Sequence, residues 1–184
     1  MRRSIAIMMT LTLSLLAPSM TRAQTAPIGF GLAGGLSTPV GSFSDDADPG
    51  WRALGTLAIS VPLVPIGLRI DGAYDHFNVD QTLVGGLTRS GSQRVASFTV
   101  NPTYRFGVPG VPLTPYLIGG IGAYNVSCGG DISCNSSTRF GWNGGVGIKL
   151  RAVVITAFAE ARYHHVSLDG GSLAYLPVTV GLLF

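Results

Sequence analysis

Apolar and polar positions alternate along most of the chain, which predicts β-strands. Successive side chains of an extended strand point to opposite faces, so every second residue shares one environment. The stretch 95–106 is the clearest example, because Phe98, Val100 and Tyr104 oppose Thr99 and Asn101. Eight such segments are predicted, at residues 28–36, 53–61, 67–77, 95–106, 116–126, 139–150, 155–164 and 174–184.

Glycine blurs the pattern in only one of these segments. Residues 116–126 contain large apolar side chains among closely spaced glycines, and the sequence leaves open which of its side chains share a face. In the last segment one face is wholly apolar and ends with Leu182 and Phe184, while Leu183 belongs to the opposite face. Such a strand needs a paired neighbour on both sides, because an open apolar edge invites aggregation.

The connections between the segments alternate in character. Long polar connections are expected after the first, third, fifth and seventh segments, at residues 37–50, 78–92, 127–138 and 167–172. Shorter or Pro/Gly-rich turns are expected after the others, at residues 62–66, 107–114 and 151–153. Alternating short turns and longer external loops are typical of bacterial outer-membrane barrels.

Two charge-poor stretches, residues 53–68 and 106–130, are long enough to suggest transmembrane helices, but their content excludes them. Pro62 and Pro65 interrupt the first, and three prolines interrupt the second. Each proline costs a helix interior about 3 kcal/mol. A closed barrel is the other structure that satisfies its backbone groups in lipid. The predicted fold is therefore an all-β, eight-stranded, antiparallel, up-and-down transmembrane barrel with short periplasmic turns and longer outer loops.

In this fold the apolar face points to lipid and the small, polar face fills the lumen. The second face carries six charged residues among Gly, Ala, Ser, Thr and Asn: Arg69, Asp71, Arg105, Lys149, Glu160 and Arg162. Aromatic residues near strand ends are expected in girdles at the membrane boundaries. These are Tyr104, Phe106, Tyr116, Trp142, Tyr163 and Phe184. The alternative is a secreted β-sandwich, but that fold would expose more Lys and Glu than this chain has.

The first 23 residues are expected to be a secretory signal peptide and not part of the fold. Arg2 and Arg3 precede an apolar stretch at residues 5–16, and Ala23 ends a small-residue cleavage site. Residues 24–184 would then form the barrel, with nine basic against nine acidic residues. This balance excludes the basic footprint of a nucleic-acid-binding protein. A chain with 46% hydrophobic residues and 26 glycines has the composition of strands and turns.

Together, the leader, the eight alternating segments and the LPVTVGLLF ending resemble the small outer-membrane barrels of Gram-negative bacteria, of the OmpA/OmpX type. The resemblance implies insertion in the cell outer membrane. It also implies that Leu182 and Phe184 serve as an assembly signal for the barrel-assembly machinery. The expected partners are outer-membrane lipids and lipopolysaccharide, with the protein a monomer. A fold of this kind transfers no activity.

Cys128 and Cys134 lie in the third outer connection, within the sequence SCGGDISC. Two cysteines in an exported protein predict a disulfide. No further metal ligands cluster there, so neither a metal nor a cofactor is expected.

The charges of the lumen permit two interpretations. They can form ion pairs that plug the barrel, for example Arg162 or Arg105 with Glu160 or Asp71, or they can line a polar path for small solutes. An eight-stranded barrel is just wide enough for side chains to fill, which favours the plug.

One pattern suggests an enzyme. His165 and Ser167 share the lipid-facing side of the seventh segment, and a His-x-Ser pair there resembles the outer-membrane lipid A deacylases. In those enzymes the serine would attack an acyl ester with histidine as base. Leu168 replaces the asparagine of that family, and only Asp169 or Glu160 could orient the histidine. The alternative is that Tyr163, His164 and His165 form part of an interfacial belt. We therefore expect a structural or surface-interaction role without catalysis.

Overall fold

The computed structural model describes residues 28–45, 47–60, 64–82, 88–107, 111–130, 136–152 and 154–184. They form eight strands and one short 3₁₀ helix. The elements are β1 (Ile28–Val40), η1 (Gly41–Asp45), β2 (Gly50–Ser60), β3 (Ile66–Thr82), β4 (Thr88–Arg105), β5 (Leu113–Gly130), β6 (Ser137–Arg151), β7 (Thr156–Leu168) and β8 (Gly171–Leu183).

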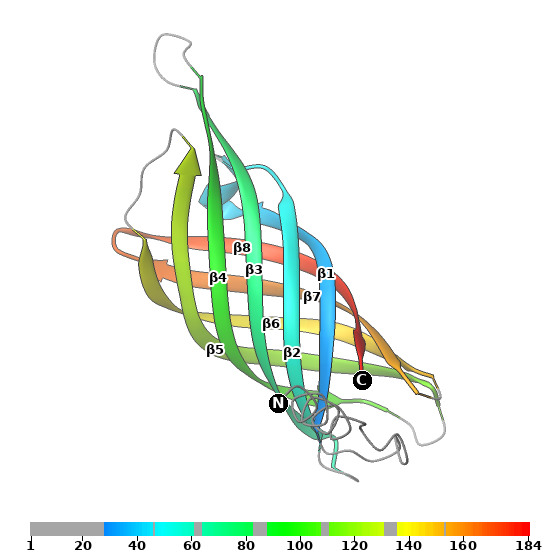
Figure 1. The fold of residues 1–184 in the computed structure, drawn as a ribbon. Helices are drawn as coiled ribbons and strands as arrows, with labels where there is room; N and C mark the ends of the chain where they lie inside the picture. The colour runs from blue at the N-terminus through cyan, green and yellow to red at the C-terminus, as the bar shows by residue number, and fades with distance from the viewer. Residues whose placement is uncertain are drawn as a thin grey trace, which may run out of the picture.

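Each strand pairs antiparallel with the next in the sequence, and β8 pairs with β1 to close the barrel (Figure 1). The predicted architecture is thus confirmed. Following the paired residues once round the wall gives the row Phe30, Leu57, Ile70, Val100, Ile121, Trp142, His165, Ala174 and Val40. The row returns to β1 ten residues further on, so the strands are tilted against the barrel axis.

Apolar side chains cover the outside of the wall. Phe30, Leu57, Val100, Val146 and Val180 are all exposed, although each is large and hydrophobic. No part of the described chain forms a helix long and apolar enough to cross a membrane.

The strands on one side of the barrel are longer than predicted. β3 and β4 continue as a paired hairpin into the second outer connection and extend beyond the ends of the other strands (Figure 1). The fourth outer connection is likewise not the polar loop expected at residues 167–172. It is a tight turn at Asp169 and Gly170, where Gly170 has a φ of 95° that favours glycine.

Candidate functional site: the lumen and the outer face of the wall

A network of four charged side chains crosses the lower lumen, toward the periplasmic end. Glu160 accepts hydrogen bonds from Arg69 Nη1 (2.7 Å), Arg162 Nε (2.7 Å) and the Tyr116 hydroxyl (2.7 Å). Asp71 accepts from Arg162 Nη2 (2.6 Å) and Asn101 Nδ2 (3.0 Å) and also pairs with Arg69. All four charged side chains are at most 2% exposed. The two positive and two negative charges balance, as burial of charge requires.

A second, smaller network lies nearer the outer end. Arg52 Nη1 donates to both carboxylate oxygens of Asp75 (2.9 and 2.7 Å), and the Ser37 hydroxyl donates to the same carboxylate. In the same part of the lumen, His164 Nδ1 bonds the Tyr124 hydroxyl at 3.0 Å. The His164 ring stacks on Tyr175 with centroids 4.9 Å apart. This level therefore holds one balanced ion pair and a stack of aromatic rings.

Apolar and aromatic side chains close the lumen from the level of this second network outward. The cluster contains Ala47, Phe77, Val79, Val95, Tyr124, Val126, Val166, Leu173 and Tyr175. Phe43 of η1 packs on it from the connection between β1 and β2, with its ring edge-on to Phe77 at 5.2 Å. We refer to these residues as the outer cap.

Four buried polar atoms in the lumen have no partner within the described part of the chain: Asn143 Oδ1, Arg162 Nη1, His164 Nε2 and the Tyr175 hydroxyl. They come from β6, β7 and β8, at the levels of the two networks. Buried groups of this kind are normally bonded to ordered water. The lumen is therefore still polar at mid-height.

The structure places the six predicted interior charges at different depths. Arg69, Asp71, Glu160 and Arg162 form the lower network. Lys149 is half-buried, with Nζ 5.0 Å from the centre of the Tyr116 ring, and Arg105 donates to the Val64 carbonyl (2.5 Å) at the periplasmic end.

Two predicted boundary residues lie inside the barrel instead. Tyr116 is 1% exposed and bonds Glu160, so its assignment to the aromatic girdle was wrong. Even-numbered side chains of β5 point inward, including Tyr116, Ile118, Tyr124 and Val126. His164 is fully buried in the lumen and does not belong to the interfacial belt with Tyr163 and His165.

Sequence reasoning missed Arg52, Ser37 and Tyr124 as lumen residues. Arg52 lies one position before the predicted second segment, although the alternation of Leu54, Thr56 and Ala58 continues through it. Arg52 is two positions before Leu54 and therefore on the same face, so continuing the alternation beyond the segment would have identified it.

The structure does not bring together the side chains that the alternative, a hydrolase, would need. The His165 ring stacks on Trp142 (5.6 Å, 28°), and no interaction between the described residues joins it to Ser167. Glu160 is held in the lumen, and Asp169 pairs with Arg139 across the outer rim. Neither acid orients the histidine.

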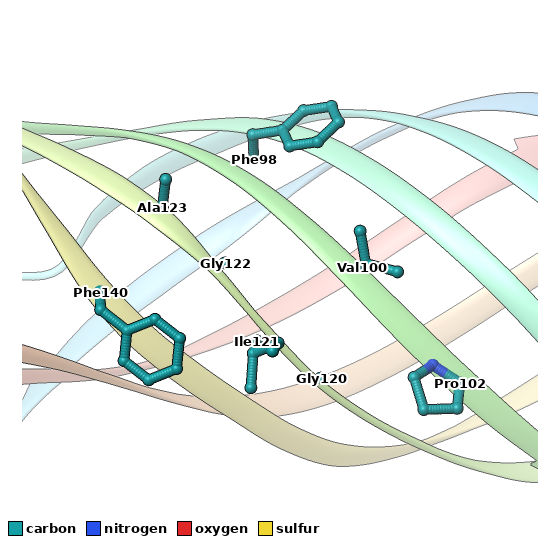
Figure 2. Close-up of a pocket in the computed structure, with 8 residues that line it drawn as sticks. All are labelled: Phe98, Val100, Pro102, Gly120, Ile121, Gly122, Ala123 and Phe140. Atoms are coloured by element: carbon teal, nitrogen blue, oxygen red, sulfur yellow. The ribbon is translucent and has the colours of Figure 1, made fainter.

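The hollow in Figure 2 lies on the outer surface of the wall between β4, β5 and β6. Its side chains come from Phe98, Val100, Pro102, Ile121, Ala123 and Phe140, with the backbone of Gly120 and Gly122 as floor. The β4–β5 pairing skips Asn101 and Pro102 beside this floor, because proline has no N–H to donate. The hollow is apolar and offers no group for chemistry.

Two further predicted features are not tested by the described residues. Cys128 lies near the outer end of β5, but Cys134 and the proposed signal peptide lie outside the described residues. The disulfide and the cleavage site stay predictions. In the described ranges, no group of His, Cys, Asp and Glu side chains is placed to hold a metal ion.

The outer membrane protein beta-barrel domain family matches residues 9–182. The chain belongs to this family. It is an integral protein of the cell outer membrane, in agreement with its closed barrel and apolar outer wall. No curated protein matches the chain in sequence.

Solved outer-membrane barrels share the fold at low sequence identity. Neisserial surface protein A is 13% identical, with a TM-score of 0.64 over 86% of this chain and 96% of that one. A major outer membrane protein from Thermus thermophilus is 13% identical, with a TM-score of 0.55 over 86% and 99%. The N-terminal barrel of Pseudomonas aeruginosa OprF is 18% identical, with a TM-score of 0.50 over 88% and 100%. These similarities show the fold alone.

Proposed function

We propose that this family member is a monomeric barrel with a closed lumen and a structural or surface-interaction role. The observation that supports it is the filling of the lumen at three levels: the lower network, the Arg52–Asp75 pair and the outer cap. Paired charges followed by an apolar seal oppose the passage of a hydrated ion, because removing its water is costly. Any activity would then reside on the outer face, the rim and the loops.

The proposed partners follow from the same reasoning. Outer-membrane lipids and lipopolysaccharide would contact the apolar wall and its outer boundary. The barrel-assembly machinery would recognise the last strand through Leu182 and Phe184, which both face outward.

Absence of catalysis is part of the proposal. It is supported by the ion pairs of Glu160 with Arg69 and Arg162, and of Asp169 with Arg139, which leave neither acid to orient His165. Without an orienting acid or a bonded base, Ser167 is an unactivated hydroxyl.

A single reconstitution tests the channel and the enzyme together. Purified protein is inserted in a planar bilayer for conductance and, separately, incubated with lipid A for mass spectrometry. We expect no discrete conductance steps and no loss of acyl chains. Discrete steps from wild-type protein would refute the closed lumen. Loss of an acyl chain that Ser167→Ala abolishes, while the variant still folds, would refute the non-enzymatic role.

A further inference from the structure

Two clusters of Trp, Tyr and His with nearly the same geometry lie on the outside of the barrel. In the first, the Trp51 ring lies 5.5 Å from Tyr74 and 5.8 Å from His76, with the histidine stacked at 23°. In the second, the Trp142 ring lies 5.5 Å from Tyr163 and 5.6 Å from His165, stacked at 28°. In both, the tryptophan and histidine are directly paired across neighbouring strands.

The two clusters lie on opposite sides of the barrel. The first is on β2 and β3 and the second on β6 and β7, four strands away in a ring of eight (Figure 1). The row of paired residues from Trp51 runs through His76 and Arg94 to Ser127 and reaches the outer end of β6. A full circuit of paired residues rises by ten residues along the strands, so the half circuit from β2 to β6 rises by five. The position of β6 at the same height as Trp51 is therefore five residues below the point that this row reaches, next to Trp142. The clusters are therefore at the same height.

That height is the outer boundary of the apolar wall. On seven strands the outward side chains change there from apolar or aromatic to polar within two positions. The changes are Leu36 to Thr38, His76 to Asn78, Ala96 to Arg94, Ala123 to Asn125, Phe140 to Thr138, His165 to Ser167 and Ala174 to Ser172. Trp and Tyr concentrate at such boundaries, where lipid headgroups begin.

The two clusters differ in the residue that is paired with the histidine on the next strand. His76 is paired with Arg94 on β4, whereas the corresponding neighbour of His165 on β8 is Ala174. Arg94 is exposed on the outer face, where its Nη2 lies beside Gly129 of β5, on the side away from His76. No acidic side chain in the described ranges forms a salt bridge with it. The row Trp51, His76, Arg94 thus carries a fixed positive charge at headgroup level, and the opposite cluster does not.

We infer that the Trp51–His76–Arg94 row binds the phosphate of a phosphorylated glycolipid of the outer leaflet, of the lipid A class. Arg94 supplies the charge and the paired N–H donors that suit a phosphate. His76 offers a second donor, and Trp51 with Tyr74 packs against the start of the acyl chains. The inference rests on the proposed contact with outer-membrane lipids but not on the closed lumen, so conductance results leave it untouched.

The test compares lipid binding by the reconstituted protein and three variants. Wild type, Arg94→Gln, His76→Gln and the matched control His165→Gln are placed in phosphatidylcholine nanodiscs. Titration with lipid A or fully dephosphorylated lipid A is followed by native mass spectrometry. We expect wild type to prefer the phosphorylated lipid and Arg94→Gln to bind it about tenfold more weakly, the loss expected for one charged hydrogen bond. His76→Gln should show a smaller loss and His165→Gln none.

Three results would overturn the inference: equal binding of the two lipids by wild type, wild-type affinity in Arg94→Gln, or equal losses in His76→Gln and His165→Gln. Unheated and boiled samples on gels verify that each variant is a folded barrel. Wild type alone gives a second measurement, because raising the salt concentration should weaken binding of the phosphorylated lipid only. Salt-independent binding would also reject the site.

Discussion

Glu160 is the side chain on which the lower network converges, because both arginines and Tyr116 donate to it. Glu160→Ala leaves two buried guanidinium groups with Asp71 as their one remaining carboxylate. We expect the free energy of unfolding to fall by about 3–5 kcal/mol, the usual cost of breaking a buried ion pair from one side. Urea titration of the folded barrel in detergent micelles measures this change.

Asp169→Ala is the matched control, since it removes an ion pair whose carboxylate is 80% exposed. Exposed pairs contribute about 0–1 kcal/mol, so this variant should unfold almost like wild type. Similar losses in the two variants would contradict a stabilising role for the lower network.

Individual lumen residues could be predicted from the sequence wherever large and small side chains alternate cleanly. Arg69, Asp71, Glu160 and Arg162 occupy the inward positions expected of them, because β3 and β7 contain few glycines. Tyr116 was misplaced because β5 presents glycine or alanine on both faces, so hydrophobicity there does not distinguish lipid from lumen. The ion-pair partners could not be predicted, because they depend on how strands far apart in the sequence align in the barrel. The pattern of a single strand does not contain that information.

At the scale of the strand, β6 offers a sharp test through two adjacent glycines. A Cβ on Gly145 would lie 2.2 Å from the Ala161 carbonyl oxygen and 2.7 Å from the Arg162 Cα, whereas one on Gly144 would meet nothing within 4 Å. Gly145→Ala should therefore force β6 and β7 apart and destabilise the barrel by about 1–3 kcal/mol. Gly144→Ala should be neutral or stabilising by up to about 1 kcal/mol. Urea midpoints of the two variants compare them directly, and a reversed order would contradict the inward and outward assignment of β6.

Strand positions could be predicted from alternation, but strand ends could not. The signals used for loops were Gly, Ser and Asn, and these residues also occur within the paired parts of β3 and β4. A hairpin that continues above the membrane keeps its backbone pairing while its side chains turn polar. Polarity therefore marks the boundary of the lipid and not the end of the strand.

At the scale of the whole molecule, closure depends on the pairing of β8 with β1. Phe184 exchanges two backbone hydrogen bonds with Phe30 (3.2 and 2.8 Å), and their rings stack at 5.5 Å. Leu183 instead points inward and packs against Leu54 and Phe158. If outward residues of the last strand direct assembly, Phe184→Ala should lower the amount of heat-modifiable barrel in the outer membrane more than Leu183→Ala does. Gel analysis of membrane fractions measures it, and equal losses would contradict the proposed signal.

The architecture as a whole could be predicted because the sequence excludes most other folds. A water-soluble fold would expose too many apolar residues, and the prolines exclude transmembrane helices. An even number of alternating strands then leaves a closed barrel. The function could not be predicted in the same way, because the fold fixes a location and not a ligand.

The uneven height of the strands has a consequence for large molecules that approach the cell. β3 continues six residues beyond His76 to Thr82, about 20 Å of strand. With the strands tilted by about 40°, this is a rise of about 15 Å, roughly half the thickness of a bilayer's hydrocarbon core. Across the barrel, β7 ends at Leu168, three residues beyond His165. A large molecule that approaches from outside would therefore meet the outer ends of β3 and β4 before the outer end of β7, which lies closer to the surrounding glycolipid. Accessibility from outside the cell should then vary around the circumference and be greatest at the outer ends of β3 and β4.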